Sequence, residues 1–160
     1  MNAVVSTLER LEGSYLSVGL RASEWVYPMV NTLHLLGIAL LVGPILILDW
    51  RILFARTSPT VLVLSAVLLP TARVGFSMAV LAGSLLFLAR PLDYALNTLF
   101  QAKLGVMAFA LLNITWLHRS KAWSLMLADG QMNPRVRLAC GFSMVFWLLA
   151  LTLGRLVGYR

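Results

Sequence analysis

Four long apolar stretches constrain what this chain can fold into more than any other feature of its sequence. Each contains at least about 20 residues, the length that an α-helix needs to cross a hydrocarbon layer of about 30 Å. The stretches extend over residues 25–48, 61–89, 97–117 and 138–158. Backbone polar groups find no partners in lipid, so a spanning segment must be a helix or part of a closed barrel, and the two-residue alternation of a barrel is absent.

The connections between these stretches are short, at about residues 50–60, 90–96 and 118–137. Short connections make neighbouring helices antiparallel, so the sequence predicts an all-α, up-and-down four-helix bundle integral to a membrane. The composition agrees, because 60% of the residues are apolar and only 12% are charged. These values exclude a disordered chain, a coiled coil and an ordinary soluble enzyme.

The segment before the first apolar stretch has a different pattern. Its charged residues are incompatible with the apolar core of a signal peptide. Apolar residues recur along it at steps of three and four, as on one face of a helix: Val4, Leu8, Leu11, Tyr15 and Val18. We predict an interfacial amphipathic helix over residues 1–22, with a loosely docked arm as the alternative, followed by a transmembrane domain over residues 23–160.

The formal net charge of +7 indicates loops that face the anionic headgroups of a lipid bilayer rather than a nucleic acid. One side of the predicted bundle holds Arg51, Arg56, Arg119, Lys121, Arg135 and Arg137. The other side holds Arg10, Arg21, Arg90 and Arg160. This difference predicts that the first and third connections are cytoplasmic and that both termini are periplasmic. The single cysteine, Cys140, excludes an intrachain disulfide framework.

Ionisable residues inside the apolar stretches are the main candidates for a functional site, because a charge in lipid is costly unless it is paired or faces a cavity. At a rise of about 1.5 Å per residue, His34, Lys103 and Arg155 fall in one leaflet, with Arg73 just beneath them. No Asp or Glu lies in the four stretches. We therefore predict a bound anionic group, either the propionates of a porphyrin or, as a weaker candidate, a quinone.

Imidazole is a common haem ligand, so His34 is the predicted axial ligand and metal-binding residue. Lys103, Arg73 and Arg155 would then hold propionates or a quinone oxygen, and Lys103 is also a candidate second ligand. Each residue has an interpretation without a ligand. His34 can hydrogen-bond to a neighbouring helix, Lys103 and Arg155 can extend to the membrane surface, and Arg73 can bind carbonyl groups freed near Pro70.

His118 ends the third stretch, separated from His34 by roughly 18–20 Å of depth. Because two axial ligands of one haem lie at nearly one depth, we do not expect His118 to bind the same haem as His34. It is instead a candidate for a separate site at the opposite surface.

The run from Trp25 to Gly37, WVYPMVNTLHLLG, and the later Leu48-Asp49-Trp50-Arg51 resemble an uncharacterised bacterial family of small four-helix membrane proteins. The segments 73–87 and 103–118 fit the same family. This resemblance covers most of residues 24–158 and implies a multi-pass protein of the bacterial inner membrane, but it implies no activity.

More distantly, the chain is similar to the HemJ-type protoporphyrinogen oxidases. Their first helix carries a His and their third a Lys followed by Leu, which here correspond to His34 and Lys103-Leu104. Members of that group bind b-type haem, so the similarity implies haem b as a cofactor. The chain is also similar to copper-resistance protein D-like membrane domains, although no helix here carries clustered Met and His ligands.

The leading hypothesis is a haem-binding membrane protein for electron transfer or for a quinone- or porphyrin-linked oxidation, with no catalytic residue singled out. The alternative is a non-enzymatic membrane subunit or a small-solute transport component, with copper as one candidate. A third hypothesis is a scaffold whose connection 118–137 binds a cytoplasmic partner through Trp123, Met126 and the basic residues there. Asp49 and Arg51 are interpreted as a surface pair. The small number of helices favours a homo-oligomer or a larger membrane complex.

Overall fold

The computed structural model describes residues 2–54, 59–129 and 133–159, which form eight helices and no strand within these ranges. Four of them are long and apolar enough to cross a membrane. These four are α3 (Val26–Phe54), α4 (Pro59–Ala89), α6 (Thr98–His118) and α8 (Pro134–Val157). The shorter helices are α1 (Asn2–Glu12), α2 (Tyr15–Ala22), α5 (Pro91–Ala95) and α7 (Lys121–Asp129). The predicted all-α architecture with four spanning helices is confirmed.

Side-chain caps fix where two of the spanning helices begin. Asn97 accepts hydrogen bonds from two backbone amides of the first turn of α6, at 2.9 and 3.2 Å. Asn133 accepts one at 2.9 Å from the first turn of α8, directly before Pro134. Such caps satisfy amides that have no partner within the helix, and a proline at the first position loses no hydrogen bond. Because of this signal, α8 begins at Pro134 rather than at residue 138.

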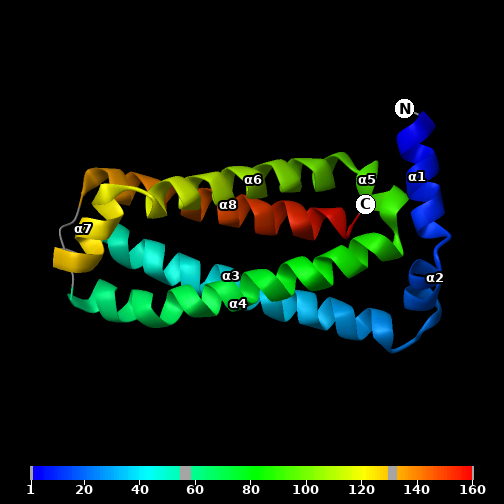
Figure 1. The fold of residues 1–160 in the computed structure, drawn as a ribbon, viewed down its shortest axis with the longest axis horizontal. Coiled ribbons are helices and arrows are strands. Elements are labelled where there is room, and N and C mark those ends of the chain that lie inside the picture. The colour runs from blue at the N-terminus through cyan, green and yellow to red at the C-terminus, as the bar shows by residue number, and fades with distance from the viewer. Residues whose placement is uncertain (1, 55–58, 130–132, 160) are drawn as a thin grey trace.

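The spanning helices run up and down in chain order (Figure 1). The closest packing joins α3 to α4 and α6 to α8, and contacts between α3 and α8 connect the two pairs. Glycine allows α3 and α4 to cross closely. A Cβ atom at Gly37 would lie 2.5 Å from the backbone nitrogen of Ala79, and one at Gly75 would collide with the backbone of Leu40 and Leu41.

The helices α1 and α2 lie across one end of the bundle, which we call the N-terminal end (Figure 1). The predicted segment 1–22 thus forms two helices where the sequence predicts one. The break follows Glu12, and the Ser14 side chain caps α2 by accepting from the backbone nitrogen of Ser17 at 3.3 Å. The buried Ser17 hydroxyl donates to the carbonyl oxygen of Ala89 at 3.3 Å, which attaches α2 to the end of α4.

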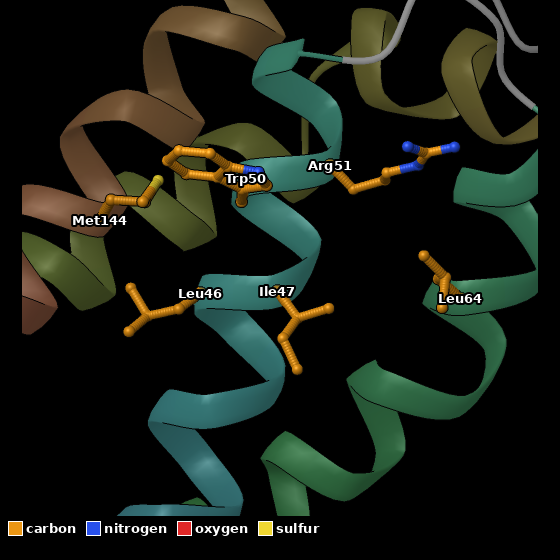
Figure 2. Close-up of a pocket in the computed structure, with 6 residues that line it drawn as sticks. All are labelled: Leu46, Ile47, Trp50, Arg51, Leu64 and Met144. Carbon is orange, nitrogen blue, oxygen red and sulfur yellow. The ribbon is translucent and has the colours of Figure 1, made fainter.

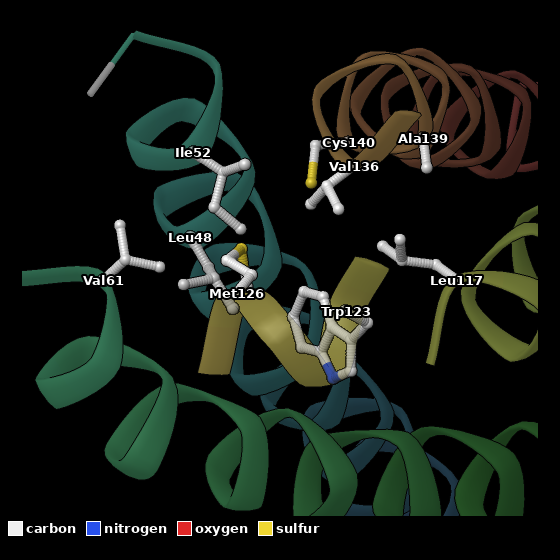
Figure 3. Packing of buried hydrophobic residues seen from close by; sticks show 9 residues of the cluster. All are labelled: Leu48, Ile52, Val61, Leu117, Trp123, Met126, Val136, Ala139 and Cys140. Atoms are coloured by element: carbon white, nitrogen blue, oxygen red, sulfur yellow. The ribbon is translucent and has the colours of Figure 1, made fainter. Parts of the chain in front are cut away.

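The opposite end of the bundle, which we call the α7 end, is filled by a buried apolar cluster (Figure 3). All four spanning helices and α7 contribute to it: Leu48, Ile52, Val61, Leu117, Trp123, Met126, Val136, Ala139 and Cys140. A second cluster occupies the middle of the bundle and consists of Leu41, Val42, Ile45, Ala72, Ala110 and Trp147. The described part of the chain has no comparable buried apolar cluster at the N-terminal end.

Burial in the first cluster corrects one hypothesis. Met126 is only 1% exposed, and Trp123 is buried beside it. These side chains hold α7 against the bundle (Figure 3), so they are not available to bind a cytoplasmic partner. Trp123 and Met126, three residues apart, instead form the inward face of this short helix.

Replacing Met126 with alanine tests how firmly α7 is held. We expect the variant to lose about 2 kcal/mol of unfolding free energy, the lower end of the range for a buried methionine. The lower end applies because lipid tails are as apolar as methionine, so most of the loss is in packing contacts. Leu125→Ala is the matched control, since Leu125 lies on the same helix and is 46% exposed. Denaturant unfolding of the solubilised protein should separate the two variants, and equal stability would contradict the packing described.

Both chain ends lie at the N-terminal end of the bundle (Figure 1). The described basic residues of the first and third connections lie toward the α7 end, as the sequence predicts. Two members of the predicted charge asymmetry, Arg56 and Arg160, lie outside the described residues.

Candidate functional site

His34 lies on α3 and faces α4 in the N-terminal half of the bundle. Its Nδ1 atom is 2.9 Å from the carbonyl oxygen of Ala79. A carbonyl oxygen only accepts hydrogen bonds, so Nδ1 carries the proton and the lone pair of the neutral imidazole is on Nε2. Metal-binding histidines are typically oriented by this kind of hydrogen bond from the second ring nitrogen.

A glycine on α4 makes room for the imidazole ring. A Cβ atom at Gly83 would lie 2.9 Å from Cε1 and 3.1 Å from Nδ1 of His34. Since real side chains do not approach so closely, any larger residue at position 83 would displace the ring. Gly83 and the Ala79 carbonyl group together fix the direction in which Nε2 points.

Lys103 approaches the same level of the bundle from α6. Its Nζ atom lies beside Gly154 of α8, where a Cβ atom would be 3.3 Å away. Lys103 is close enough to His34 for an electrostatic interaction between the two side chains. No described acidic residue forms an ion pair with Lys103, and the ion pairs Arg21–Glu12 and Arg90–Asp93 lie outside the spanning helices. An imidazole lone pair and an unpaired ammonium group are therefore brought together.

The helix that carries Lys103 is loosely packed at this level. The buried residues of α6 are Ala110 and Leu117, and none of residues 98–109 is buried. The neighbouring wall is aromatic, with Phe87, Tyr94 and Phe100 in ring contact at centroid distances of 5.3 to 6.4 Å. Burial, together with a hydrogen bond to Tyr27, raises the pKa of Tyr94 to about 12, so this phenol stays neutral.

Arg73 does not join His34 and Lys103. It is exposed on α4 and acts electrostatically on His118, whose ring contacts Trp123 at a centroid distance of 4.6 Å. Side chains on a helix tilt toward its N-terminus, and the N-terminus of α4 is at the α7 end. The depth of its Cα atom, which is all that counting residues gives, predicts Arg73 just beneath His34 and Lys103. Arg73 and His118 instead form a second basic pair, near the α7 end.

Arg155 also has a different neighbour from the predicted one. Its Nη2 atom donates to the Tyr159 hydroxyl at 2.5 Å, and the guanidinium group lies 4.6 Å from the centre of the same ring. The side chain is exposed and directed along its own helix toward the chain end. This placement agrees with the interpretation in which Arg155 extends to the membrane surface.

A groove and a pocket are formed by described residues near the spanning helices, and His34 lines neither of them. A groove of about 380 Å³ crosses α3 between α4 and α8, as Figure 2 shows, and is lined by Leu46, Ile47, Trp50, Arg51, Leu64 and Met144. A pocket of about 290 Å³ at the N-terminal end is lined by Arg21, Ser23, Glu24, Tyr27, Pro28 and Arg90. Tyr27 is roughly 10 Å along α3 from His34, so the second pocket lies on the surface side of the His34 level. The sequence did not indicate that Arg21 and Arg90 would line one pocket, because only the fold brings α2 to the end of α4.

Asp49 is a further residue that the sequence analysis misjudged. It is only 7% exposed and lies between α3 and α8, whereas Arg51 is exposed in the outer groove. The interpretation of these two residues as a surface pair is therefore wrong. The side-chain partners of the Asp49 carboxyl group are Ser143 and Cys140 of α8. The spacing of Cys140, Ser143 and Trp147 on one face of a helix is the signal that could have indicated this polar strip.

A metal ion at His34 would need ligands from a bound group. Within residues 2–54, 59–129 and 133–159, no three His, Cys, Asp or Glu side chains gather closely enough to hold a metal. Comparisons with protein-family models, with curated proteins and with solved structures give no match.

Proposed function

We propose that this protein binds b-type haem inside the membrane and serves electron transfer or a quinone- or porphyrin-linked oxidation. The observation that carries the proposal is the hydrogen bond between His34 Nδ1 and the Ala79 carbonyl oxygen, which leaves Nε2 as a free lone pair near Lys103. Bound haem would supply a one-electron iron couple and four of the ligands that the chain lacks.

The residues present fit such a group in two respects. Gly83 leaves room for the imidazole ring against α4, and the Ala79 carbonyl oxygen orients it, so Nε2 is held ready to bind an axial position. Lys103 offers an ammonium group with no acidic partner among the described residues, which suits a propionate, and its neutral amine form would suit a second axial ligand. The absence of buried residues over 98–109 supports a ligand in place of a packed core.

The other predicted binding residues take lesser roles in this proposal. Arg73 and Arg155 have His118 and Tyr159 as neighbours, so their candidacy for the propionates has no geometric support. Arg21 and Arg90 line the pocket on the surface side of His34 and are better candidates for a propionate or a quinone oxygen. A copper-transport role is less well supported, because no described cluster of metal ligands is present.

We further propose a location in a bacterial inner membrane, with α1 and α2 in its periplasmic interface. The exposed apolar side chains of Val4, Tyr15 and Leu16 support contact with lipid there. Exposed aromatic residues on the spanning helices, such as Phe109 and Phe142, are compatible with lipid or with a further copy of the chain. A homo-oligomer or a larger complex remains part of the proposal.

An absorption spectrum tests the proposal directly. We expect detergent-purified protein to show a Soret band and, after reduction with dithionite, the sharpened visible bands of a b-type haem. If the protein is purified without haem, titration with haemin should restore the band at a ratio of one haem per chain. Colourless protein that gives no band on titration would contradict the proposal and leave only the membrane architecture.

A further inference from the structure

A buried carboxyl group lies in the half of the bundle opposite His34. Asp49 is 7% exposed, and its α8 partners Ser143 and Cys140 are 3% and 1% exposed. The Ser143 hydroxyl and the Cys140 thiol are the hydrogen-bonding partners of the carboxyl group, and its Oδ2 atom is buried without any partner. At about 1.5 Å per residue, Asp49 is roughly 22 Å along α3 from His34, so the two sites are separate.

Nothing on the two helices that form this interface neutralises a negative charge on Asp49. On α8 the titratable group that faces it is Cys140, and the half-buried Arg137 one turn earlier is not among the groups that act on this carboxyl group. On α3 the nearest cation, Arg51, is exposed in the outer groove.

Among the residues that the structure describes, the other elements around the site provide no counter-ion either. The influences on the carboxyl group are burial, Ser143 and Cys140. The remaining basic groups described at this end lie elsewhere: Arg73 of α4 acts on His118 of α6, and His118 contacts Trp123 of α7. Arg119, Lys121 of α7 and Arg135 of α8 are exposed. An ionised carboxyl group buried without a paired cation costs several kcal/mol, and such groups neutralise instead.

We propose that Asp49, Ser143 and Cys140 form a proton-binding site inside the membrane, in which the Asp49 carboxyl group carries an exchangeable proton. A metal ion is a poorer occupant, because hard cations need six or more oxygen ligands. Here the thiol of Cys140 is a soft ligand, and the nearby Ala139 carbonyl oxygen already accepts from Asn113 Nδ2 at 2.8 Å. A proton needs only the one free oxygen that the site provides.

The site is closed toward the α7 end. Cys140 belongs to the apolar cluster that Trp123 and Met126 complete, so α7 separates it from water on that side (Figure 3). Toward the middle of the membrane, the strip on α8 continues to Trp147, whose buried Nε1–H group also lacks a partner. A proton held here is therefore shielded from water at the α7 end of the bundle. This inference does not depend on haem binding.

Labelling with N,N′-dicyclohexylcarbodiimide tests the proposal. A protonated carboxyl group adds to this apolar reagent: its O–H bond breaks, a C–O bond forms to the central carbon, and the proton goes to a nitrogen. Acyl transfer to nitrogen then leaves a stable adduct. With the full-length protein at neutral pH, we expect at least about tenfold more adduct on Asp49 than on the exposed Asp93, because desolvation of an ion costs well over the 1.4 kcal/mol of a tenfold ratio. Peptide mass spectrometry measures both sites, and labelling should fall as the pH rises.

Two further comparisons and the pH series make the labelling test decisive. A water-soluble carbodiimide should label Asp93 but not Asp49. Labelling of Asp49 should be the same in a sodium buffer and in a choline buffer at the same pH. If sodium protects Asp49 from the carbodiimide, the proposal is overturned in favour of a cation site. Folded protein that is unlabelled at Asp49 at every pH would overturn it outright.

The variant Asp49→Asn gives an independent readout. Asparagine resembles a protonated carboxyl group in shape and charge, so we expect this variant to keep the thermal stability of the parent protein and to lose the adduct. If the variant does not fold, infrared spectroscopy of the unaltered protein decides instead. A protonated carboxylic acid has a carbonyl stretching band that a carboxylate lacks, and absence of a deuterium-sensitive band of this kind would overturn the proposal.

Discussion

Gly75→Ala is expected to destabilise the bundle by about 3 kcal/mol, the upper end of the range for overpacking a close-packed site. The added methyl group would collide with the backbone of Leu40 and Leu41, which cannot rotate away as a side chain can. The helices α3 and α4, which form the largest helix contact of the fold, would have to separate along the crossing. Unfolding of the detergent-solubilised protein by heat or by denaturant measures the loss.

Gly105→Ala is the matched control for this prediction, because it makes the same chemical change in another spanning helix. A Cβ atom at Gly105 has nothing within 4 Å. We expect this variant to be neutral or to gain up to about 1 kcal/mol, since alanine is the better helix former. Equal stability of the two variants would mean that α3 and α4 do not cross as closely as described.

His34→Ala is expected to remove the haem absorbance entirely. The substitution deletes the Nε2 lone pair and leaves the neighbouring glycine and carbonyl group intact. Haemin titration, followed in the Soret region, measures the loss. External imidazole should restore part of the band, because the space that the ring occupied remains open in this variant.

His118→Ala is the control, since the structure pairs His118 with Arg73 and Trp123 rather than with His34. This variant should keep the full band. Gly83→Ala should give an intermediate result, because its methyl group displaces the His34 ring and such outer-shell changes weaken metal affinity by about 10–100-fold. Loss of the band in His118→Ala but not in His34→Ala would assign the ligand to the other basic pair.

The spanning helices could be predicted because the rule that creates them is local. A long apolar run has no alternative in lipid but to satisfy its backbone as a helix, whatever its neighbours are. The ends were less predictable. The helix α3 continues to Phe54, past the expected end near Leu48, because Asp49 and Ile52 pack into the bundle instead of facing water.

The candidate site was predicted only in part, for a different reason. The depth of a Cα atom follows from counting residues, and this places His34 and Lys103 at a similar level. The direction of a long side chain and the helix that it meets do not follow from counting. For this reason the sequence did not predict that Arg73 lies near His118, or that Asp49 contacts Ser143 rather than Arg51.

That this chain forms four apolar helices long enough to span a membrane, with basic groups inside them, follows from its residues alone, because apolar length and the cost of an unpaired backbone act within each segment. Which of these groups meet depends on how the helices pack. Contacts between helices depend on crossing points such as Gly37 with Gly75, and on which way each helix runs. These are properties of pairs of segments, and no single segment contains them.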